Sequence, residues 1–222
     1  MTGNNKSPLG STRVQDASTR FFISNPAYPN LADLPKELPP NDSTNQYLWY
    51  PMYVKYRKEL SVKAVLDDHD FRTFVPMETY HVKRGASVRT EKRPAIHNLL
   101  FVYSFKERIS WMKMFNADCE PLQYMSRHFL NGSSEIITVT QKAMENIIKA
   151  ASVDDPNGQR TYIDRPLQIT DLDRRIKFVN GAFKDIEGII KRINGNRAMI
   201  IPLTQGINMR ITITHATDIE FI

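Results

Sequence analysis

Side chains that catalyse reactions or bind metals are few in this sequence, and they are widely spaced. The five histidines stand singly, without the His-x-x-x-His or Cys-x-x-Cys spacing of a zinc site. They are His69, His81, His97, His128 and His215. The acidic pair Asp67-Asp68 beside His69 is interpreted as the solvated end of a helix. The sequence therefore predicts no metal site and no cofactor.

Cys119 is the single cysteine and the one candidate thiol nucleophile. A lone cysteine before Glu120-Pro121 is more often a small buried hydrophobic residue. Gly181 and Gly188 do not match a phosphate-binding loop, because neither a Gly-Lys-Ser/Thr sequence nor a helix follows them. We therefore predict that the protein is not an enzyme. The alternative is an enzyme that uses Cys119 as its nucleophile.

Bulk composition indicates a protein of the reducing cytoplasm, since one cysteine excludes an intrachain disulfide framework. No segment approaches the roughly 20 apolar residues of a membrane span, so no membrane partner is expected. The formal net charge is +6, and residues 46–150 carry 16 basic and 11 acidic side chains. A surplus of this size suits a surface that faces phosphate but does not by itself define one.

Hydrophobic patterning predicts an α+β domain over residues 46–152. Aromatic and β-branched runs indicate strands, and apolar residues spaced three and four apart indicate helices. The expected order is strand 46–54, helix 56–69, strand 71–82, strand 94–105, helix 106–115, strand 121–127 and a final helix that ends near residue 151. Thr140 is the predicted N-cap of that last helix. Residues 82–94 are expected to form a polar, basic connection.

Two segments are predicted to lack regular structure. Residues 1–45 are rich in Asn, Ser, Thr and Pro, which is typical of a disordered arm. Residues 153–173 begin with the cluster Asp154-Asp-Pro-Asn-Gly158, which breaks any regular element. They are predicted to be a linker.

Residues 174–222 are predicted to form a small β-barrel. Alternating apolar and polar side chains bracket Gly181 and Gly188, as in short strands joined by turns. Asn194-Gly195-Asn196 separates two apolar runs, which is a strong signal for a short hairpin. Gly188 precedes a paired-aliphatic strand and is expected either to adopt a positive φ or to allow close backbone approach.

Both halves of the chain contain motifs of one known family. Residues 178–190, with Gly181-Ala-Phe and then Gly188 before paired isoleucines, resemble the KOW module of NusG-type transcription elongation factors. Trp49-Tyr50, Phe74-Val-Pro76 and the run from Arg93 to Val102 resemble the NGN domain of the same factors. Among them, the likeness is strongest to the specialised RfaH and UpxY paralogues of capsule operons. The resemblance covers about residues 46–222.

This resemblance implies an NGN α/β sandwich with an antiparallel sheet, joined by a linker to a KOW (SH3-like) barrel. It further implies a transcription antitermination and elongation factor that binds the clamp of RNA polymerase beside the DNA of the elongation complex. Surface-polysaccharide operons are the expected targets, and the barrel would recruit the ribosome or a termination factor. The alternative is an RNA-binding KOW protein of the ribosome or of RNA processing that acts without polymerase.

The same resemblance assigns site residues. The polymerase-binding residues are expected to be Tyr53, Phe74, Ile96, His97, Leu99 and Phe101. Tyr53, Ile96 and Leu99 are predicted to form an exposed apolar patch, whereas Phe74 and Phe101 are interpreted as core. Ile96 and Leu99 replace a Phe and a Tyr of the family pattern, which favours a reshaped depression.

Basic residues near the start of the first helix are the predicted nucleic-acid contacts: Lys55, Arg57, Lys58 and Lys63. The resemblance places this face beside the DNA of the transcription bubble. An ordinary solvated helix face is the alternative interpretation.

Overall fold

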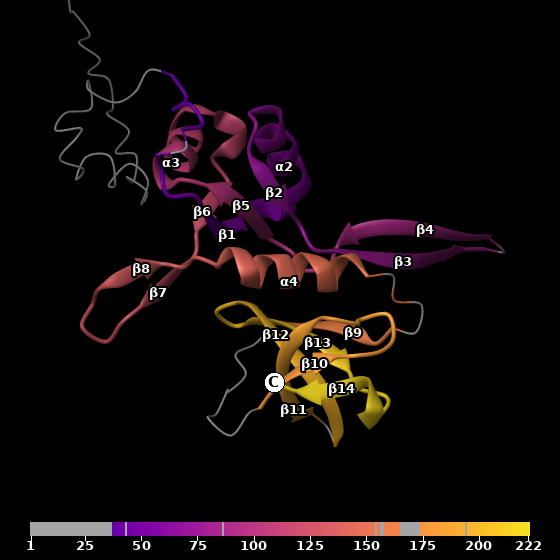
Figure 1. Ribbon diagram of the computed structural model, residues 1–222. Coiled ribbons are helices and arrows are strands. Elements are labelled where there is room, and N and C mark those ends of the chain that lie inside the picture. The colour runs from indigo at the N-terminus through magenta and orange to yellow at the C-terminus, as the bar shows by residue number, and fades with distance from the viewer. Residues whose placement is uncertain are drawn as a thin grey trace, which may run out of the picture.

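The computed structural model describes residues 37–42, 44–85, 87–153, 155, 158–164, 174–193 and 195–222. The predicted N-terminal arm before residue 37 and most of the predicted linker lie outside the described residues. Within the described chain, an α/β unit, a long helix and a C-terminal β unit follow one another (Figure 1). This arrangement confirms the predicted α+β class.

The first sheet has four antiparallel strands in the order β2-β5-β1-β6. Their bounds are β1 Leu48–Val54, β2 Arg72–Phe74, β5 Leu99–Ser104 and β6 Leu122–Tyr124. β1 pairs with β5 from Leu48 opposite Ser104 to Tyr53 opposite Leu99. All residues of β5 except Tyr103 are buried, as its continuous apolar run predicts.

Helices α2 (Glu59–Asp68) and α3 (Lys106–Phe115) cover one face of this sheet. Met52 of β1 and Leu100 of β5 belong to the core beneath them, together with Leu66 and Ile109 of the two helices. The short 3-10 helices η2 (Lys55–Arg57) and η3 (Ala117–Cys119) flank the pair. α2 begins later than predicted because Tyr56 and Arg57 adopt positive φ angles of 64° and 54°.

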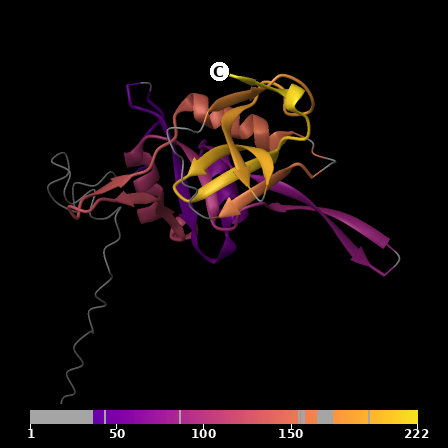
Figure 2. The same cartoon turned by 90° about the horizontal axis from the view of Figure 1, so that it is seen from below.

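Two hairpins extend from this unit in different directions (Figures 1 and 2). The longer hairpin joins β3 (Met77–Arg84) to β4 (Ser87–Pro94), and the shorter joins β7 (Ser126–His128) to β8 (Ser134–Ile136). Residues 82–94 were expected to be a polar, basic connection between strands, and that prediction was wrong because most of them belong to β3 and β4 themselves. β4 is solvated along most of its length, so it lacks the apolar alternation that reveals a half-buried strand.

Helix α4 (Gln141–Ser152) lies between the sheet and the C-terminal β unit (Figure 1). Its predicted N-cap is confirmed, since the Thr140 side chain accepts a hydrogen bond of 3.3 Å from the Ala143 N–H. Met144, Ile147 and Ala150 of α4 are fully buried in one hydrophobic cluster with residues of both neighbours. The helix therefore connects the two halves of the molecule through a shared core.

The C-terminal barrel is a curved six-stranded antiparallel sheet with the order β14-β10-β11-β12-β13-β9 (Figure 2). Its strands are β9 Arg160–Asp164, β10 Arg175–Phe178, β11 Glu187–Ile193, β12 Asn196–Thr204, β13 Ile207–Thr212 and β14 Ile219–Phe221. The short 3-10 helix η4 (Ala216–Asp218) precedes β14. The predicted hairpin is confirmed by the pairing of β11 with β12 on either side of Gly195, whose φ is 82°.

β9 lies inside residues 153–173, where a linker without regular structure was predicted. It pairs with β13 from Arg160 opposite Ile211 to Asp164 opposite Ile207. The sequence of residues 154–158 predicts that α4 ends there, but it does not predict the structure of the residues that follow. Long-range pairing with β13, rather than local sequence, makes residues 160–164 a strand.

Candidate functional site

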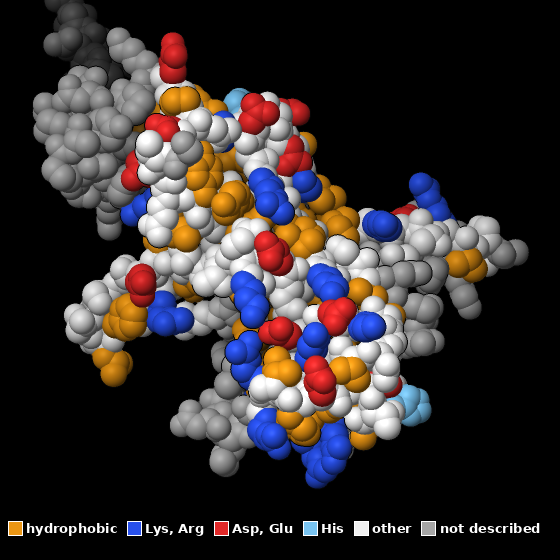
Figure 3. Space-filling view, viewed as in Figure 1, with side chains coloured by type: hydrophobic (Ala, Val, Ile, Leu, Met, Phe, Trp, Pro, Cys, Tyr) orange, Lys and Arg blue, Asp and Glu red, His pale blue; other side chains and the backbone are white. Residues whose placement is uncertain are grey.

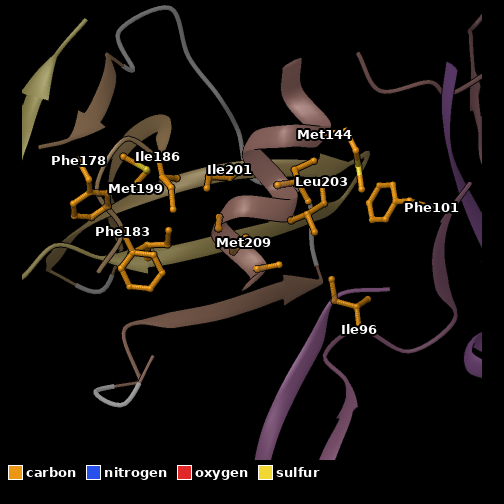
Figure 4. Close-up of a cluster of buried hydrophobic side chains, with 14 of the residues drawn as sticks. Ile96, Phe101, Met144, Phe178, Phe183, Ile186, Met199, Ile201, Leu203 and Met209 are labelled. Carbon is orange, nitrogen blue, oxygen red and sulfur yellow. The ribbon is translucent and has the colours of Figure 1, made fainter. Parts of the chain in front are cut away.

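The second face of the four-stranded sheet contains most of the residues assigned to polymerase binding. Leu99 and Phe101 point from β5 into the cluster that contains α4 and the barrel. Figure 4 shows this cluster running from Phe101 past Met144 of α4 and Leu203 of the barrel to Phe178 and Phe183. The face of the sheet is thus covered by protein in this structure.

This cover contradicts part of the predicted patch. Ile96 is 6% exposed and Leu99 is 1% exposed, so the prediction that both are exposed was wrong. Local sequence could not reveal their burial, because the covering residues belong to α4 and to a barrel about 100 residues further along the chain. Phe101 is buried, which agrees with its interpretation as core.

Three of the six residues are wholly or partly accessible. Tyr53 lies directly opposite Leu99 at the end of β1 and is 41% exposed. His97 is exposed in the turn before β5, and Phe74 at the end of β2 is half-buried. Phe74 lines a hollow of about 630 Å³ between the base of the β3–β4 hairpin and the end of α4. These three residues are the part of the predicted site that a partner can reach without displacing α4.

A buried carboxylate joins this site to the basic segment. Glu59, at the start of α2, is 1% exposed and accepts a hydrogen bond from the backbone N–H of Asn98. The Asn98 side-chain oxygen in turn accepts from the Arg57 N–H at 3.1 Å. His97 Nδ1 lies 4.0 Å from Glu59 Oε1. These contacts fix the position of the His97 turn relative to η2.

Lys55, Arg57 and Lys58 are brought together at η2, and they flank an aromatic residue that the sequence interpretation did not select. Tyr56 is 78% exposed and adopts a left-handed φ of 64°. A positive φ is uncommon for a bulky side chain, and strained positions of this kind are concentrated at functional sites. An aromatic ring among basic residues is a known pattern of nucleic-acid-binding surfaces, and that was the signal that the sequence offered.

Lys63 differs from the other three predicted nucleic-acid contacts. Its ammonium group lies 2.5 Å from Asp67 Oδ2 one helical turn away, and it donates to the Thr73 hydroxyl at 3.0 Å. Because a carboxylate already neutralises it, Lys63 has less charge to offer to a phosphate. The pairing with Asp67 therefore favours the alternative interpretation of Lys63 as part of an ordinary solvated helix face.

Polar contacts accompany the hydrophobic core between α4 and the barrel. Lys149 of α4 lies 3.9 Å from Asp185, which also binds Lys177 at 3.1 Å. Close to Lys149, at the C-terminal end of α4, Arg160 of β9 donates two hydrogen bonds of 2.8 Å to the carbonyl oxygens of Ala150 and Val153. The C-terminal end of α4 is therefore tied to the barrel by polar contacts from two of its segments, β9 and the loop that contains Asp185.

The remaining candidate nucleophile is poorly suited to catalysis. Cys119 is fully buried, and burial raises the pKa of its thiol to about 12, with a smaller contribution from Asp118. A thiol of this kind is almost entirely protonated at neutral pH, whereas the thiolate is the reactive form. No group of three or more His, Cys, Asp or Glu side chains suited to a metal ion occurs among the described residues.

Within the part of the chain that the structure describes, no helix has the length and apolar character needed to cross a membrane.

Comparison with known proteins finds a family similar to the α/β unit. Residues 47–148 match the NusG family model, described as transcription termination factor nusG. These residues include the four-stranded sheet, both hairpins, α2, α3 and most of α4. This part of the chain is thus similar to the NusG family domain.

A solved structure titled "Domain interaction in Thermotoga maritima NusG" is similar to this chain at 12% sequence identity with a TM-score of 0.39. The match covers 80% of this chain and 98% of that one. No curated protein matches the chain.

Proposed function

We propose that this protein is a NusG-like transcription elongation and antitermination factor that binds RNA polymerase and promotes processive transcription. The observation that carries the proposal is the match of residues 47–148 to the NusG family model. The mechanism involves no covalent chemistry: a factor that prefers one conformation of polymerase shifts the enzyme toward that conformation by differential affinity alone. The finer features of the RfaH and UpxY paralogues, including action on surface-polysaccharide operons, belong to this proposal.

The polymerase contact is proposed to use the accessible end of the sheet. Tyr53 and His97 are exposed there, and Phe74 lines the neighbouring hollow. An aromatic side chain that is half exposed and fixed on a strand loses little conformational freedom when it binds a partner. Ile96, Leu99 and Phe101 support this surface from below, and they contact polymerase only if α4 moves away.

The basic segment at η2 is proposed to lie near the DNA of the elongation complex. Lys55, Arg57 and Lys58 surround exposed Tyr56, which adds a ring on which an unpaired base can stack. Lys63 is the weakest member of the set because Asp67 pairs with it. The C-terminal barrel is proposed to recruit a further partner, the ribosome or a termination factor.

The test measures the affinity of purified protein for core RNA polymerase and for a reconstituted elongation complex. Tyr53→Ala with His97→Ala should weaken both affinities while the melting temperature stays constant, and Tyr53→Phe should retain binding because it keeps the ring. Lys55→Ala with Arg57→Ala should weaken binding to the elongation complex alone and lower its salt dependence. A wild-type protein that binds neither complex would overturn the proposal.

A second candidate function is RNA binding by the barrel without polymerase. Arg192 and Arg197 lie directly opposite each other at the end of the β11–β12 hairpin, and both are exposed. Like charges in this position repel each other, and neither arginine pairs with an acidic residue of the described chain. A phosphate group between the two guanidinium groups would remove the repulsion.

This candidate predicts binding of single-stranded RNA in the absence of polymerase, with a steep salt dependence. Arg192→Ala with Arg197→Ala should reduce RNA affinity and flatten the salt dependence. Arg174→Ala is the control, because that guanidinium stacks on Phe221 at 3.9 Å in the same barrel. Equal RNA affinity for all three proteins would eliminate the second candidate.

A further inference from the structure

The turn between β7 and β8 exposes two large hydrophobic side chains next to each other. Leu130 is fully exposed and Phe129 is 43% exposed. Figure 3 shows hydrophobic atoms at the outer end of this hairpin, away from the body of the protein. We call residues 129–133 the β7–β8 tip. Adjacent exposed apolar side chains on a projecting turn are unfavourable in water and are typical of a contact with a partner.

Hydrogen bonds hold the β7–β8 tip in a defined shape. The Phe129 N–H donates to the Ser133 carbonyl at 2.9 Å, and the Gly132 N–H donates to the Phe129 carbonyl at 3.0 Å. The Asn131 side chain accepts from the Ser133 N–H at 3.0 Å and from the Ser133 hydroxyl at 2.7 Å. Gly132 supplies the positive φ of 81° that the turn requires. The tip is therefore ordered before any partner binds, which lowers the entropic cost of binding.

The charges beside the tip discriminate between classes of partner. Arg127 lies directly opposite Glu135 in the hairpin, so these two charges cancel. A segment that binds an anionic membrane or a nucleic acid combines its apolar or aromatic residues with an excess of Lys and Arg. The β7–β8 hairpin has no such excess. A convex apolar tip with neutral flanks suits a concave apolar pocket in a protein.

The position of the tip separates it from the contact proposed above. Val139, which follows β8, bridges to Trp49 at the start of β1, whereas Tyr53 lies near the end of the same strand. The hairpin thus leaves the sheet at the end opposite to Tyr53 and His97. Two contacts at opposite ends of one rigid sheet strengthen each other, because formation of the first raises the effective concentration of the second.

We propose that the β7–β8 tip inserts Leu130 and Phe129 into an apolar pocket of RNA polymerase, as a second contact independent of Tyr53. This inference rests on the proposed polymerase binding. Leu130 enters the pocket, Phe129 packs at its mouth, and the polar side chains of Asn131 and Ser133 stay hydrogen-bonded within the turn.

The test compares three proteins in binding to purified core RNA polymerase. Phe129→Ser with Leu130→Ser should reduce the affinity at least about tenfold, with little change in the effect of salt. Val88→Ser is the matched control: Val88 is 59% exposed near the tip of the β3–β4 hairpin, and its replacement should leave the affinity unchanged. All three proteins should melt at similar temperatures, because the substituted side chains are exposed.

A photo-crosslinking residue in place of Leu130 identifies what the tip touches. Crosslinking to a polymerase subunit supports the inference, whereas crosslinking solely to nucleic acid overturns it. Binding of wild type to phosphatidylglycerol vesicles that the double variant loses would also overturn it, in favour of a membrane contact. If wild type and double variant bind polymerase equally, this inference alone fails; if wild type does not bind at all, the proposed function fails as well.

Discussion

The side-chain amide of Asn146 in α4 makes two hydrogen bonds with the backbone of Glu187 in β11, one through its nitrogen and one through its oxygen. Its Nδ2 donates to the Glu187 carbonyl at 2.6 Å, and its Oδ1 accepts from the Glu187 N–H at 3.0 Å. An amide side chain thus satisfies a backbone donor and a backbone acceptor that β11 presents to α4. This contact fixes the position of the barrel along α4. Hydrophobic packing alone is less directional and does not select one such position.

Replacing Asn146 with alanine should lower the free energy of unfolding by about 1–3 kcal/mol, because the backbone groups of Glu187 lose their partner. Lys142→Ala is the control. The Lys142 ammonium group lies 3.9 Å from the Glu187 carboxylate and is largely exposed, so its loss should cost less than about 1 kcal/mol. Urea denaturation of both variants measures the difference, and equal costs would mean that the amide contact contributes nothing specific.

The cross-strand neighbours Tyr53 and Leu99 should respond oppositely to truncation. Leu99→Ala should destabilise the protein by about 2–5 kcal/mol, because it leaves a cavity in the cluster under α4. Tyr53→Ala should change the stability little, because much of the ring is solvated. Thermal unfolding followed by circular dichroism tests the pair. A stable Leu99→Ala protein would mean that this face of the sheet is not packed in solution.

Because Ile96 and Leu99 are buried, the double variant Ile96→Glu with Leu99→Glu should not behave as it would if the two residues formed an exposed patch. An exposed patch would accept both carboxylates with little loss of stability, but the buried positions require their desolvation. We therefore expect this double variant to unfold, so that its failure to bind polymerase would carry no information on the contact. Tyr53 and His97 are the appropriate positions for that experiment.

Sequence patterns were sufficient for the elements whose burial is local. The continuous apolar run of β5, the Thr140 cap of α4 and the hairpin of β11 and β12 all have short-range signatures in the sequence, and each was predicted correctly. β4 and β9 were missed for a physical reason. β4 is solvated, and β9 is a strand through its pairing with β13, so neither has a pattern within its own sequence.

Only part of the candidate site could be predicted, because exposure near a strand end is a local property whereas burial by distant segments is not. The basic residues at η2 and the aromatic Tyr53 are accessible, as surface residues near a strand end are expected to be. The burial of Ile96 and Leu99 depends on the docking of α4 and the barrel, which is a tertiary contact between distant segments. The exposed tip at Leu130 also escaped prediction, because an isolated Phe-Leu pair is equally compatible with a core position.

Gly188 provides a test of close packing between β11 and β12. A Cβ atom there would lie 2.7 Å from the Ile200 carbonyl oxygen and 2.4 Å from Met199 Cγ, which confirms the close approach predicted from the sequence. Gly188→Ala should destabilise the barrel by about 1–3 kcal/mol, because the carbonyl belongs to the backbone and cannot rotate away. Gly85→Ala has free space around Cβ but a φ of 62°, so it isolates the cost of backbone strain alone. Amide exchange in β11 and β12 should accelerate in Gly188→Ala and stay unchanged in Gly85→Ala.

The buried thiol predicts a loss of stability at alkaline pH. Burial raises the pKa of the Cys119 thiol from its ordinary value of 9.0 to about 12, so the thiol ionises more readily in the unfolded chain than in the folded one. Its contribution is fully present below pH 9 and is lost as the pH rises through about 12. Tyr50 and Tyr162, whose pKa values burial raises from 10.0 to about 12, act in the same direction at slightly higher pH.

Denaturation of wild type and Cys119→Ala between pH 7 and about 11 separates these contributions. The wild-type protein should lose more stability than Cys119→Ala between about pH 9 and 11, since ionisation of the two tyrosines is common to both proteins. Polymerase binding at neutral pH should be the same for both proteins, because a protonated buried thiol takes no part in the proposed contacts. A Cys119→Ala protein that folds but loses its function would instead revive the thiol as a functional group.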